Sequence, residues 1–315
     1  MANQIINRML KLKTRPMMGN VSSENFELVE EEVRDIEDGE ILIKNLFLSF
    51  DPTQRGWLND VPSYIPPVKI GEIMRASSVG RVIESKNENF SIDDIVQGSF
   101  GWQEYAISGD EKGFMPPRKL PEGITPTSAL SIYGVTGLTA YFGMIDIGKP
   151  EKNNTVLISG AAGATGSVAG QIARIKGATN VIGIAGGSDK CKWVVEEAGF
   201  DSCIDYKNED VAKRVTELAP KGLDIYFDNV GGSILEIALG NIAQKARVVM
   251  CGGISSGYTM ERLAPGPSTV FNLIIQRGRM EGFIVLDYAE QFPHAIMELA
   301  GWVAEGKITY KEDIA

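Results

Sequence analysis

The sequence is poor in the residues that usually bind a catalytic zinc ion. Its 315 residues include one histidine, His294, and three cysteines, Cys191, Cys203 and Cys251, which lie apart in the chain. A catalytic zinc commonly takes three protein ligands from His, Cys and acidic residues, and a disulfide scaffold takes an even set of cysteines. We therefore expect neither a metal site nor a disulfide framework, and we interpret the cysteines as small buried residues.

The sequence also lacks a basic patch and a long apolar run. Its 31 Lys and Arg residues are outnumbered by 41 Asp and Glu residues, which gives a net charge of -10, whereas binding to a nucleic-acid backbone needs clustered positive charge. No stretch reaches the roughly 18 apolar residues of a membrane-spanning helix, and the N-terminus has no apolar run of the signal-peptide type. We therefore expect no nucleic-acid or membrane partner, and we predict a cytoplasmic enzyme with a small-molecule substrate.

The first part of the chain is rich in short strand patterns. Residues 40–50 (EILIKNLFLSF) and 79–85 (VGRVIES) contain many β-branched and aromatic residues, and glycine, proline and acidic pairs interrupt such runs at short intervals. This spacing predicts a β-barrel or sandwich over residues 1–126. With 315 residues, 43 % of them hydrophobic, the chain is long enough for about two domains with cores of their own.

From about residue 127 onwards, strand and helix patterns alternate. Residues 128–148 form an apolar segment that predicts one or two helices, and helical patterns separate the strands that follow it. The expected strands are 155–159, 180–185, 202–206, 223–228, 246–251 and 280–285. Apolar strands joined by helical crossovers are typical of a buried parallel sheet, so we predict an α/β fold with a Rossmann doubly wound sheet.

A glycine-rich turn joins the first of these strands to the helix that follows it. Within residues 159–166 (SGAAGATG), Gly160, Gly163 and Gly166 recur at intervals of three. Glycine permits a tight turn and the close approach of a pyrophosphate, and the N-terminus of the following helix offers unpaired N–H groups. Between a strand and a helix this pattern indicates a dinucleotide site. Tight packing of the helix on the strand, without a ligand, is the alternative.

The end of the second strand indicates which dinucleotide is bound. An NAD site has an acidic residue there for the ribose 2′-hydroxyl, but this chain has glycine, glycine and serine at residues 186–188. These small residues leave room for a 2′-phosphate, and Lys190 or Lys192 can pair with it. A charge-assisted hydrogen bond of about 1.5–3 kcal/mol favours NADPH over NADH roughly tenfold to a hundredfold. Asp189 also lies here, and we expect it to point away as a first-turn helix residue.

Several longer motifs resemble those of one protein family. They include ENFELVEEEV, LSFDPTQRGW, GVTGLTAYFGMIDIG, SGAAGATGSVAGQIARIKG, DIYFDNVGG, CGGISSGY and RMEGFIV. In this combination the sequence resembles the zinc-independent medium-chain dehydrogenases/reductases, in the branch of leukotriene B4 12-hydroxydehydrogenase, prostaglandin reductase, curcumin reductase and alkenal double-bond reductase. The resemblance implies a GroES-like β-barrel catalytic domain over residues 1–126, to which 308–315 return. It also implies a Rossmann NADP-binding domain over 127–307 and a homodimer.

The resemblance further implies which residues bind the cofactor, NADP(H). The glycine turn matches the family's pyrophosphate site, the residues around Lys190 match its 2′-phosphate site, and two later segments match its nicotinamide site. The expected cofactor-binding residues are Gly163, Ala164, Thr165, Gly166, Gly187, Ser188, Lys190, Tyr206, Asn229, Cys251, Gly252, Ser255, Tyr258, Phe283, Ile284 and Val285.

The activity that the resemblance implies is NADPH-dependent reduction of the C=C bond of an α,β-unsaturated aldehyde or ketone, with direct hydride transfer to the β-carbon. The charge that develops on the carbonyl oxygen needs a donor, which is a side-chain hydroxyl, a backbone N–H or the cofactor's ribose 2′-hydroxyl. Tyr64 and Tyr258 are the candidate catalytic residues. Each is equally explained as a pocket-lining aromatic residue, and bulk water can supply the proton. The chain departs from the family at Thr53, where members often carry tyrosine, and at Ile275, where the leukotriene branch carries tyrosine.

Two other functions are compatible with these motifs. An NADPH:quinone oxidoreductase on the same scaffold would turn over quinones faster than enals. A non-catalytic NADPH-binding protein would bind the cofactor without turnover, and the chain's end at Ala315, earlier than family members normally end, keeps this alternative open. A substrate panel with NADPH distinguishes the three functions.

Overall fold

The computed structural model describes residues 5–16, 21–109, 115–256 and 266–315. The described residues up to Leu130 form one compact unit, and those from Ser131 onwards form a second. Residues 308–315, assigned to the first domain in the sequence analysis, lie in the second unit. They are held there because the Gln171 side chain donates to Thr309 O at 2.8 Å and accepts from Thr309 N at 2.7 Å.

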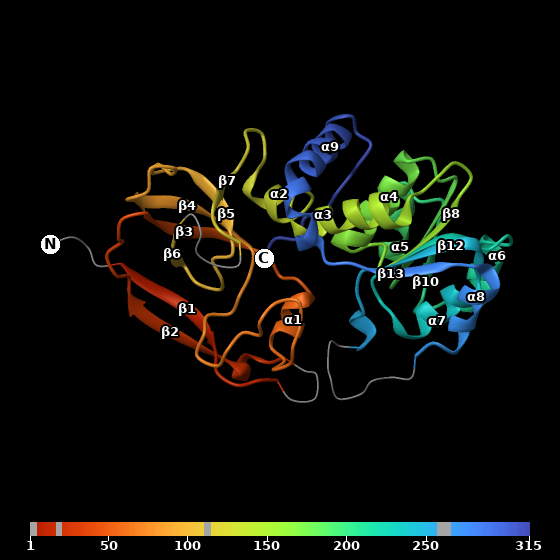
Figure 1. Cartoon of the computed structure of the whole chain (residues 1–315), viewed down its shortest axis with the longest axis horizontal. Helices are drawn as coiled ribbons and strands as arrows, with labels where there is room; N and C mark the ends of the chain where they lie inside the picture. Colours follow the sequence, from red (N-terminus) through yellow and green to blue (C-terminus); the bar gives the residue numbers. More distant parts are fainter. Residues whose placement is uncertain (1–4, 17–20, 110–114, 257–265) are drawn as a thin grey trace. The chain divides into compact units, whose positions relative to one another are not determined.

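The first unit is built on a five-stranded antiparallel sheet with the strand order β6-β3-β4-β5-β7 (Figure 1). A second antiparallel sheet pairs β1 with β2, and β1 also contacts the rest of the unit through isolated bridges from Met9 to Gln103 and from Lys11 to Ile73. The strands are β1 Ile6–Leu12, β2 Phe26–Glu32, β3 Glu40–Leu48, β4 Ser78–Ser85, β5 Ile95–Gly98, β6 Tyr105–Gly109 and β7 Arg118–Lys119. Two short helices, α1 Thr53–Trp57 and α2 Pro126–Leu130, complete the elements used below.

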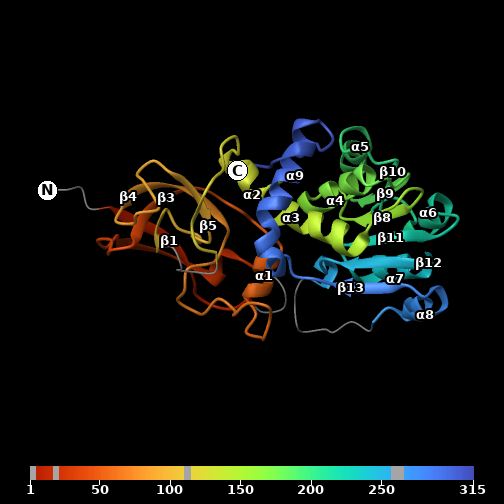
Figure 2. The same cartoon turned by 45° about the horizontal axis from the view of Figure 1, so that its top comes forward.

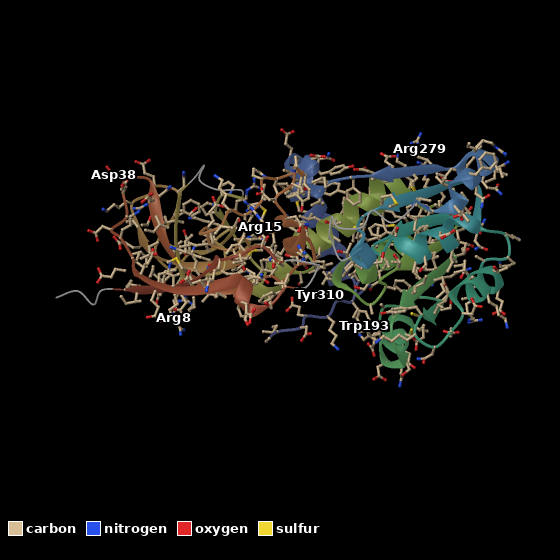
Figure 3. All side chains as sticks on the ribbon, turned by 90° about the horizontal axis from the view of Figure 1, so that it is seen from below. Arg8, Arg15, Asp38, Trp193, Arg279 and Tyr310 are labelled. Atoms are coloured by element: carbon tan, nitrogen blue, oxygen red, sulfur yellow. The ribbon has the colours of Figure 1, made fainter. Side chains whose placement is uncertain are left out.

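Residues of the five-stranded sheet supply much of the core of this unit. Strands β3 and β4 approach closely at Gly80, where a Cβ atom would lie 2.3 Å from Ile43 Cγ2 and 2.7 Å from Lys44 O, so only glycine fits. One cluster of buried hydrophobic residues consists of Ile41, Ile43, Val82, Phe90, Val96, Phe100 and Ala106. Charged side chains such as Arg8 and Asp38 lie at the surface (Figure 3).

The second unit contains a six-stranded parallel sheet with the order β10-β9-β8-β11-β12-β13. Its strands are β8 Thr155–Ser159, β9 Asn180–Ala185, β10 Ser202–Asp205, β11 Leu223–Asp228, β12 Ile242–Met250 and β13 Arg279–Gly282. The first strand in sequence, β8, sits beside the fourth, β11, so the strand order reverses between them. This is the doubly wound Rossmann order, which confirms the predicted fold class.

Helices cover both faces of the parallel sheet (Figure 2). They are α3 Val135–Phe142, α4 Ala164–Ile175, α5 Ser188–Glu196, α6 Val211–Leu218, α7 Gly232–Gly240, α8 Asn272–Gln276 and α9 Phe292–Ala304. Val156 and Ile158 of β8 pack in one core with α3, α4 and α9, while Leu157 between them packs in the other core with α6 and α7. This alternation follows from the two-residue period of a strand. No helix in the described part of the chain is long and apolar enough to cross a membrane.

The last strand is shorter than the sequence pattern predicts. Strand β13 ends at Gly282, whereas we expected a strand up to residue 285. Its partner β12 ends at Met250 because the next two N–H groups, of Cys251 and Gly252, both donate to Asp228 O at 2.9 Å. With β12 turned toward β11, the residues after Gly282 have no partner strand and leave the sheet.

Candidate functional site

The glycine turn lies between β8 and α4 and has no room for a side chain at Gly166. Gly160 adopts a φ of 61°, in the left-handed region, and accepts a hydrogen bond from Gly163 N at 3.0 Å. A Cβ atom on Gly166 would lie 2.3 Å from Gly160 O. No side chain among the described residues caps the N-terminus of α4, so its first N–H groups are available to an anion, together with the positive end of the helix dipole. This geometry fits a dinucleotide pyrophosphate beside Gly163, Ala164 and Thr165.

The point where the strand order reverses is held together by a buried polar network. Asn229, directly after β11, donates through Nδ2 to Ser159 O at 2.7 Å and through its backbone N to Ser159 Oγ at 2.9 Å. Ser159 Oγ in turn donates to Asp228 Oδ1 at 3.1 Å. Asp228 is fully buried and also accepts from the hydroxyl of Tyr226 at 2.7 Å. Ser159, Tyr226 and Asp228 were absent from the expected site, and they position Asn229 at the edge where ligands bind in this fold.

Small residues connect the end of β9 to the start of α5. Gly187 precedes α5 with a φ of 96°, which favours glycine, and Ser188 and Lys190 lie in the first turn of the helix. The ring of Tyr206 lies over Gly186, where a Cβ atom would be 2.8 Å from the ring. The structure therefore places Gly187, Ser188 and Lys190 at the start of α5 and the Tyr206 ring over the preceding Gly186.

The charged side chains around this turn differ in their partners. Lys192 pairs with Glu196 at 3.8 Å, one helical turn further along α5. Lys190 is exposed and has no ion pair within the described part of the chain. Asp189 is exposed in the same first turn. Of the two candidate lysines, Lys190 is thus the one whose charge is available to an anion.

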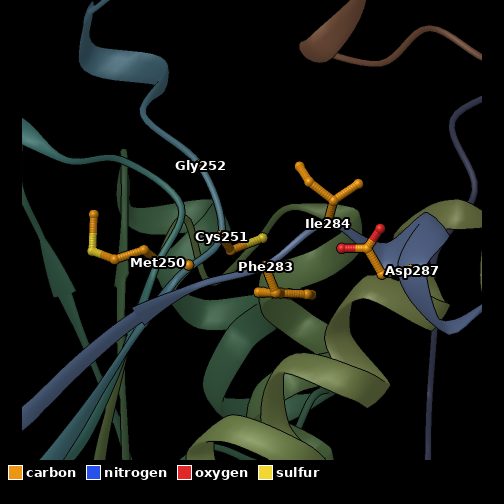
Figure 4. A pocket seen from close by; sticks show the side chains of 7 residues that line it. Met250, Cys251, Gly252, Phe283, Ile284 and Asp287 are labelled. Carbon is orange, nitrogen blue, oxygen red and sulfur yellow. The ribbon is translucent and has the colours of Figure 1, made fainter. Parts of the chain in front are cut away.

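An open pocket of about 530 Å³ lies at the ends of β12 and β13 (Figure 4). Its lining residues are Met250, Cys251, Gly252, Gly282, Phe283, Ile284 and Asp287. Four of these, Cys251, Gly252, Phe283 and Ile284, are expected cofactor residues, whereas Asp287 is an acidic residue that the motif comparison missed. Val285 is 8 % exposed and packs in the core of the unit.

Ser255 lies away from this pocket lining, beside the loop that follows β11. Its backbone N donates to Val230 O at 3.0 Å, and a Cβ atom on Gly232 would lie 2.8 Å from Ser255 Oγ. Ser255 therefore belongs with Asn229 at the switch point, and its proposed contact with the cofactor stays a prediction.

The three cysteines are free thiols. Burial raises the pKa of Cys251 to about 12, with a further contribution from the charge of Asp228, and burial likewise raises the pKa of Cys191 and Cys203. All three thiols therefore stay protonated at neutral pH and are poor nucleophiles and metal ligands. In the described ranges of the chain, no group of three or more His, Cys, Asp or Glu side chains is arranged to bind a metal ion.

Tyr64 belongs to the first unit and its hydroxyl lies in a small hydrogen-bonded group. Trp57 Nε1 donates to the Tyr64 hydroxyl at 3.0 Å, and Thr53 Oγ1 lies 2.5 Å from the same oxygen. The Tyr64 side chain is 45 % exposed, so it can also reach a ligand. Thr53, noted above as a departure from the family motif, is thus a direct partner of the candidate donor. Tyr258, the other candidate, lies outside the described residues.

Comparison with known proteins identifies the family. A family model described as "N-terminal domain of oxidoreductase" matches residues 8–116, and one described as "Zinc-binding dehydrogenase" matches residues 164–301. The NADPH-dependent curcumin reductase of Escherichia coli (strain K12) is 38 % identical over 314 residues, which cover 98 % of this chain and 89 % of that protein. The NADP(+)-dependent 2-alkenal reductase of Nicotiana tabacum is 36 % identical over 279 residues, covering 88 % of this chain and 80 % of that protein.

A solved structure shows the same similarity. The crystal structure of CurA in complex with NADPH from Vibrio vulnificus matches with a TM-score of 0.89 and 38 % identity, over 97 % of this chain and 90 % of that chain. Together these matches define the chain as an oxidoreductase. It belongs to the medium-chain dehydrogenase/reductase family, in the zinc-independent branch that contains the curcumin, prostaglandin and 2-alkenal reductases. The family predicted from the motifs is thereby confirmed.

Proposed function

We propose that this oxidoreductase is an NADPH-dependent reductase of the C=C bond of α,β-unsaturated aldehydes and ketones. NADP(H) as cofactor is supported by the name of the curcumin reductase relative and by the NADPH in the CurA structure. The substrate class is supported by the name of the tobacco relative, a 2-alkenal reductase. The observation in this chain that carries the proposal is the end of β9, where small residues and the exposed Lys190 replace the acidic residue of an NAD site.

The second unit supplies the binding groups for this reaction. The turn before α4 and the N–H groups of its first residues bind the pyrophosphate. Lys190 pairs with the 2′-phosphate, beside the exposed ring of Tyr206. The pocket lined by Cys251 and Phe283 takes the nicotinamide. When bound, NADPH supplies the hydride that passes to the β-carbon of the substrate.

The first unit contributes a hydrogen-bond donor for the substrate carbonyl. Trp57 Nε1 is a donor only, so the Tyr64 oxygen accepts from it and keeps its own proton for another acceptor. Between Thr53 Oγ1 and the Tyr64 hydroxyl, either group can be the donor: Thr53 Oγ1 accepts the Tyr64 proton, or it donates its own proton to the Tyr64 oxygen. With Thr53 as donor, the Tyr64 proton is left to donate to a substrate oxygen and to stabilise the charge that develops on it.

A substrate panel tests the reaction class and the cofactor together. The intact protein is mixed with NADPH or NADH and with enals, enones and quinones, and oxidation of the nicotinamide is followed by absorbance. We expect turnover of enals and enones with NADPH, and a reduced C=C bond in the product by mass spectrometry and NMR. Faster turnover of quinones would favour the quinone oxidoreductase, and NADPH binding without any turnover would favour a non-catalytic protein.

Lys190→Ala is expected to reduce the preference for NADPH over NADH roughly tenfold to a hundredfold, because the charge-assisted contact with the 2′-phosphate is lost. The ratio of kcat/KM for the two cofactors measures this change. Lys192→Ala is the matched control, since Lys192 lies on the same helix but pairs with Glu196. An unchanged ratio in Lys190→Ala would place the phosphate contact elsewhere.

Tyr64→Phe is expected to lower kcat/KM for an enal about tenfold, the effect of losing one hydrogen bond of about 1.4 kcal/mol in the transition state. The affinity for NADPH should stay at the wild-type value, since Tyr64 belongs to the first unit. Tyr105→Phe, in β6 of the same unit, controls for the loss of a hydroxyl group. Wild-type turnover by Tyr64→Phe would leave Tyr258 or water as the donor.

We also propose that the protein is a cytoplasmic homodimer, as the family resemblance implies. Light scattering on the purified protein should then give twice the chain mass of 34.2 kDa. A mass of one chain at micromolar concentration would contradict this assembly.

A further inference from the structure

An acidic residue that the proposed mechanism does not use lies directly behind the 2′-phosphate site. Asp205 ends β10, in register with Ala185 at the end of β9, and its side chain is 7 % exposed. In an NAD site an acidic residue at the end of the second strand binds the ribose 2′-hydroxyl. Asp205 is one strand further, close to the same place, and its charge would oppose a 2′-phosphate if it were free.

The Asp205 carboxylate is instead occupied by protein donors. Its Oδ1 accepts from Gly187 N at 2.8 Å and from Lys207 N at 3.1 Å, and its Oδ2 accepts from Asn208 Nδ2 at 2.7 Å. These bonds, above all that from Gly187, hold the pKa of Asp205 below its usual range. The carboxylate is thus ionised at neutral pH, and three protein donors are directed at its two oxygens.

The hydrogen bond from Gly187 N to Asp205 connects the turn after β9 with the turn after β10. Tyr206, the next residue, donates from its backbone N to Ala185 O at 3.1 Å, and its ring lies over Gly186. The turn after β10 therefore contacts residues 185, 186 and 187 in succession. Gly187 has a φ of 96° and directly precedes α5, so its orientation determines where Ser188 and Lys190 lie in the first turn of the helix.

We infer that Asp205 is a positioning residue for cofactor selectivity, which holds Gly187 so that the first turn of α5 presents Ser188 and Lys190 to a 2′-phosphate. This inference rests on the proposed use of NADP(H). The Gly187 N–H, once bonded to Asp205, is not available to a ribose hydroxyl. Selectivity therefore depends on a hydrogen bond between two neighbouring strand ends as well as on the lysine.

Binding of two cofactor fragments to the intact protein tests the inference without turnover. Isothermal titration calorimetry measures the Kd of adenosine 2′,5′-bisphosphate (2′,5′-ADP), which carries the 2′-phosphate, and of 5′-AMP, which differs from it only in lacking that phosphate. The wild type should prefer 2′,5′-ADP by roughly tenfold or more. Asp205→Ala should reduce this preference at least about fivefold, through weaker binding of 2′,5′-ADP, with the Kd of 5′-AMP within about twofold of the wild type.

Two further variants separate positioning from simple loss of stability. Asp205→Asn keeps an acceptor for Gly187 N and should retain the wild-type preference. Asp210→Ala removes the carboxylate that caps α6, where it accepts from Lys213 N at 3.1 Å, and should lower the melting temperature without changing the preference. Asp205→Ala with a wild-type preference, or with equal weakening of both fragments, would overturn the inference, as would Asp205→Asn behaving like Asp205→Ala. A wild type without preference for 2′,5′-ADP would overturn the proposed cofactor as well.

Discussion

Replacing Gly166 by alanine is expected to weaken the binding of NADPH by more than about a hundredfold, since displacements of about 1 Å in a positioned site cost this much. The added Cβ atom would lie 2.3 Å from Gly160 O and 2.9 Å from Gly160 C, both of them backbone atoms that have no side-chain freedom. The turn must therefore open, and the N–H groups that face the pyrophosphate move with it. Titration of NADPH by quenching of tryptophan fluorescence measures the loss.

Gly163→Ala is the matched control for this change. A Cβ atom on Gly163 would lie 3.2 Å from Gly160 O, a contact that a shift of a few tenths of an ångström relieves, and the φ of -84° suits alanine. We expect a loss of affinity below about tenfold. Circular dichroism of both variants checks that the fold persists. Equal affinities in the two variants would show that the contact between Gly166 and Gly160 does not shape the site.

The glycine turn could be predicted because everything it needs is contiguous in the chain. Gly160, Gly163 and Gly166 follow an apolar strand and precede a helical pattern, and the structure places the end of the strand and the start of the helix at residues 159 and 164. The same holds for the small residues after β9. Such features can be predicted from the local sequence because strands, turns and helices each have a characteristic residue pattern.

The residues that support the site could not be found in the same way, because their partners are distant in the sequence. Asn229 is held by Ser159, 70 residues before it, and Gly187 is held by Asp205, 18 residues after it. One signal was nevertheless present. Asp205 and Asp228 are both acidic residues at the carboxyl end of an apolar strand, the edge where this fold binds ligands. Such residues bind a ligand directly or, as here, hold the loops that do.

The length of the last strand shows a further limit of the sequence pattern. Residues 280–285 are apolar enough for a strand, yet the sheet stops at Gly282 because β12 turns away toward Asp228. Pairing depends on where the neighbouring strand ends, which apolar content does not reveal. The pocket at this place, with Asp287 in its lining, follows from that early end.

Asp228→Ala is expected to lower the free energy of unfolding of the second unit by about 3–5 kcal/mol, because several buried donors lose their acceptor at about 1–3 kcal/mol each. Asp228 is fully buried. Its Oδ1 accepts from Ser159 Oγ at 3.1 Å and Tyr226 OH at 2.7 Å. It also accepts from Val230 N at 2.9 Å and Gly231 N at 2.8 Å.

Asp224→Ala, on the same strand, is the control for the loss of a carboxylate that does not belong to this network. Asp224 is partly exposed, and its Oδ2 accepts one bond, from Thr155 N at 2.7 Å. We expect a cost of about 1 kcal/mol for it. Amide hydrogen exchange in β8 and β11 compares the two variants within the second unit. A difference below about 1 kcal/mol would contradict the network. A large difference would show that losing the Asp228 hydrogen bonds between the ends of β8 and β11 is among the most destabilising losses of a polar contact in the unit. The same hydrogen-bond network positions Asn229. The stability of the second unit and the proposed cofactor site therefore both depend on the buried carboxylate of Asp228.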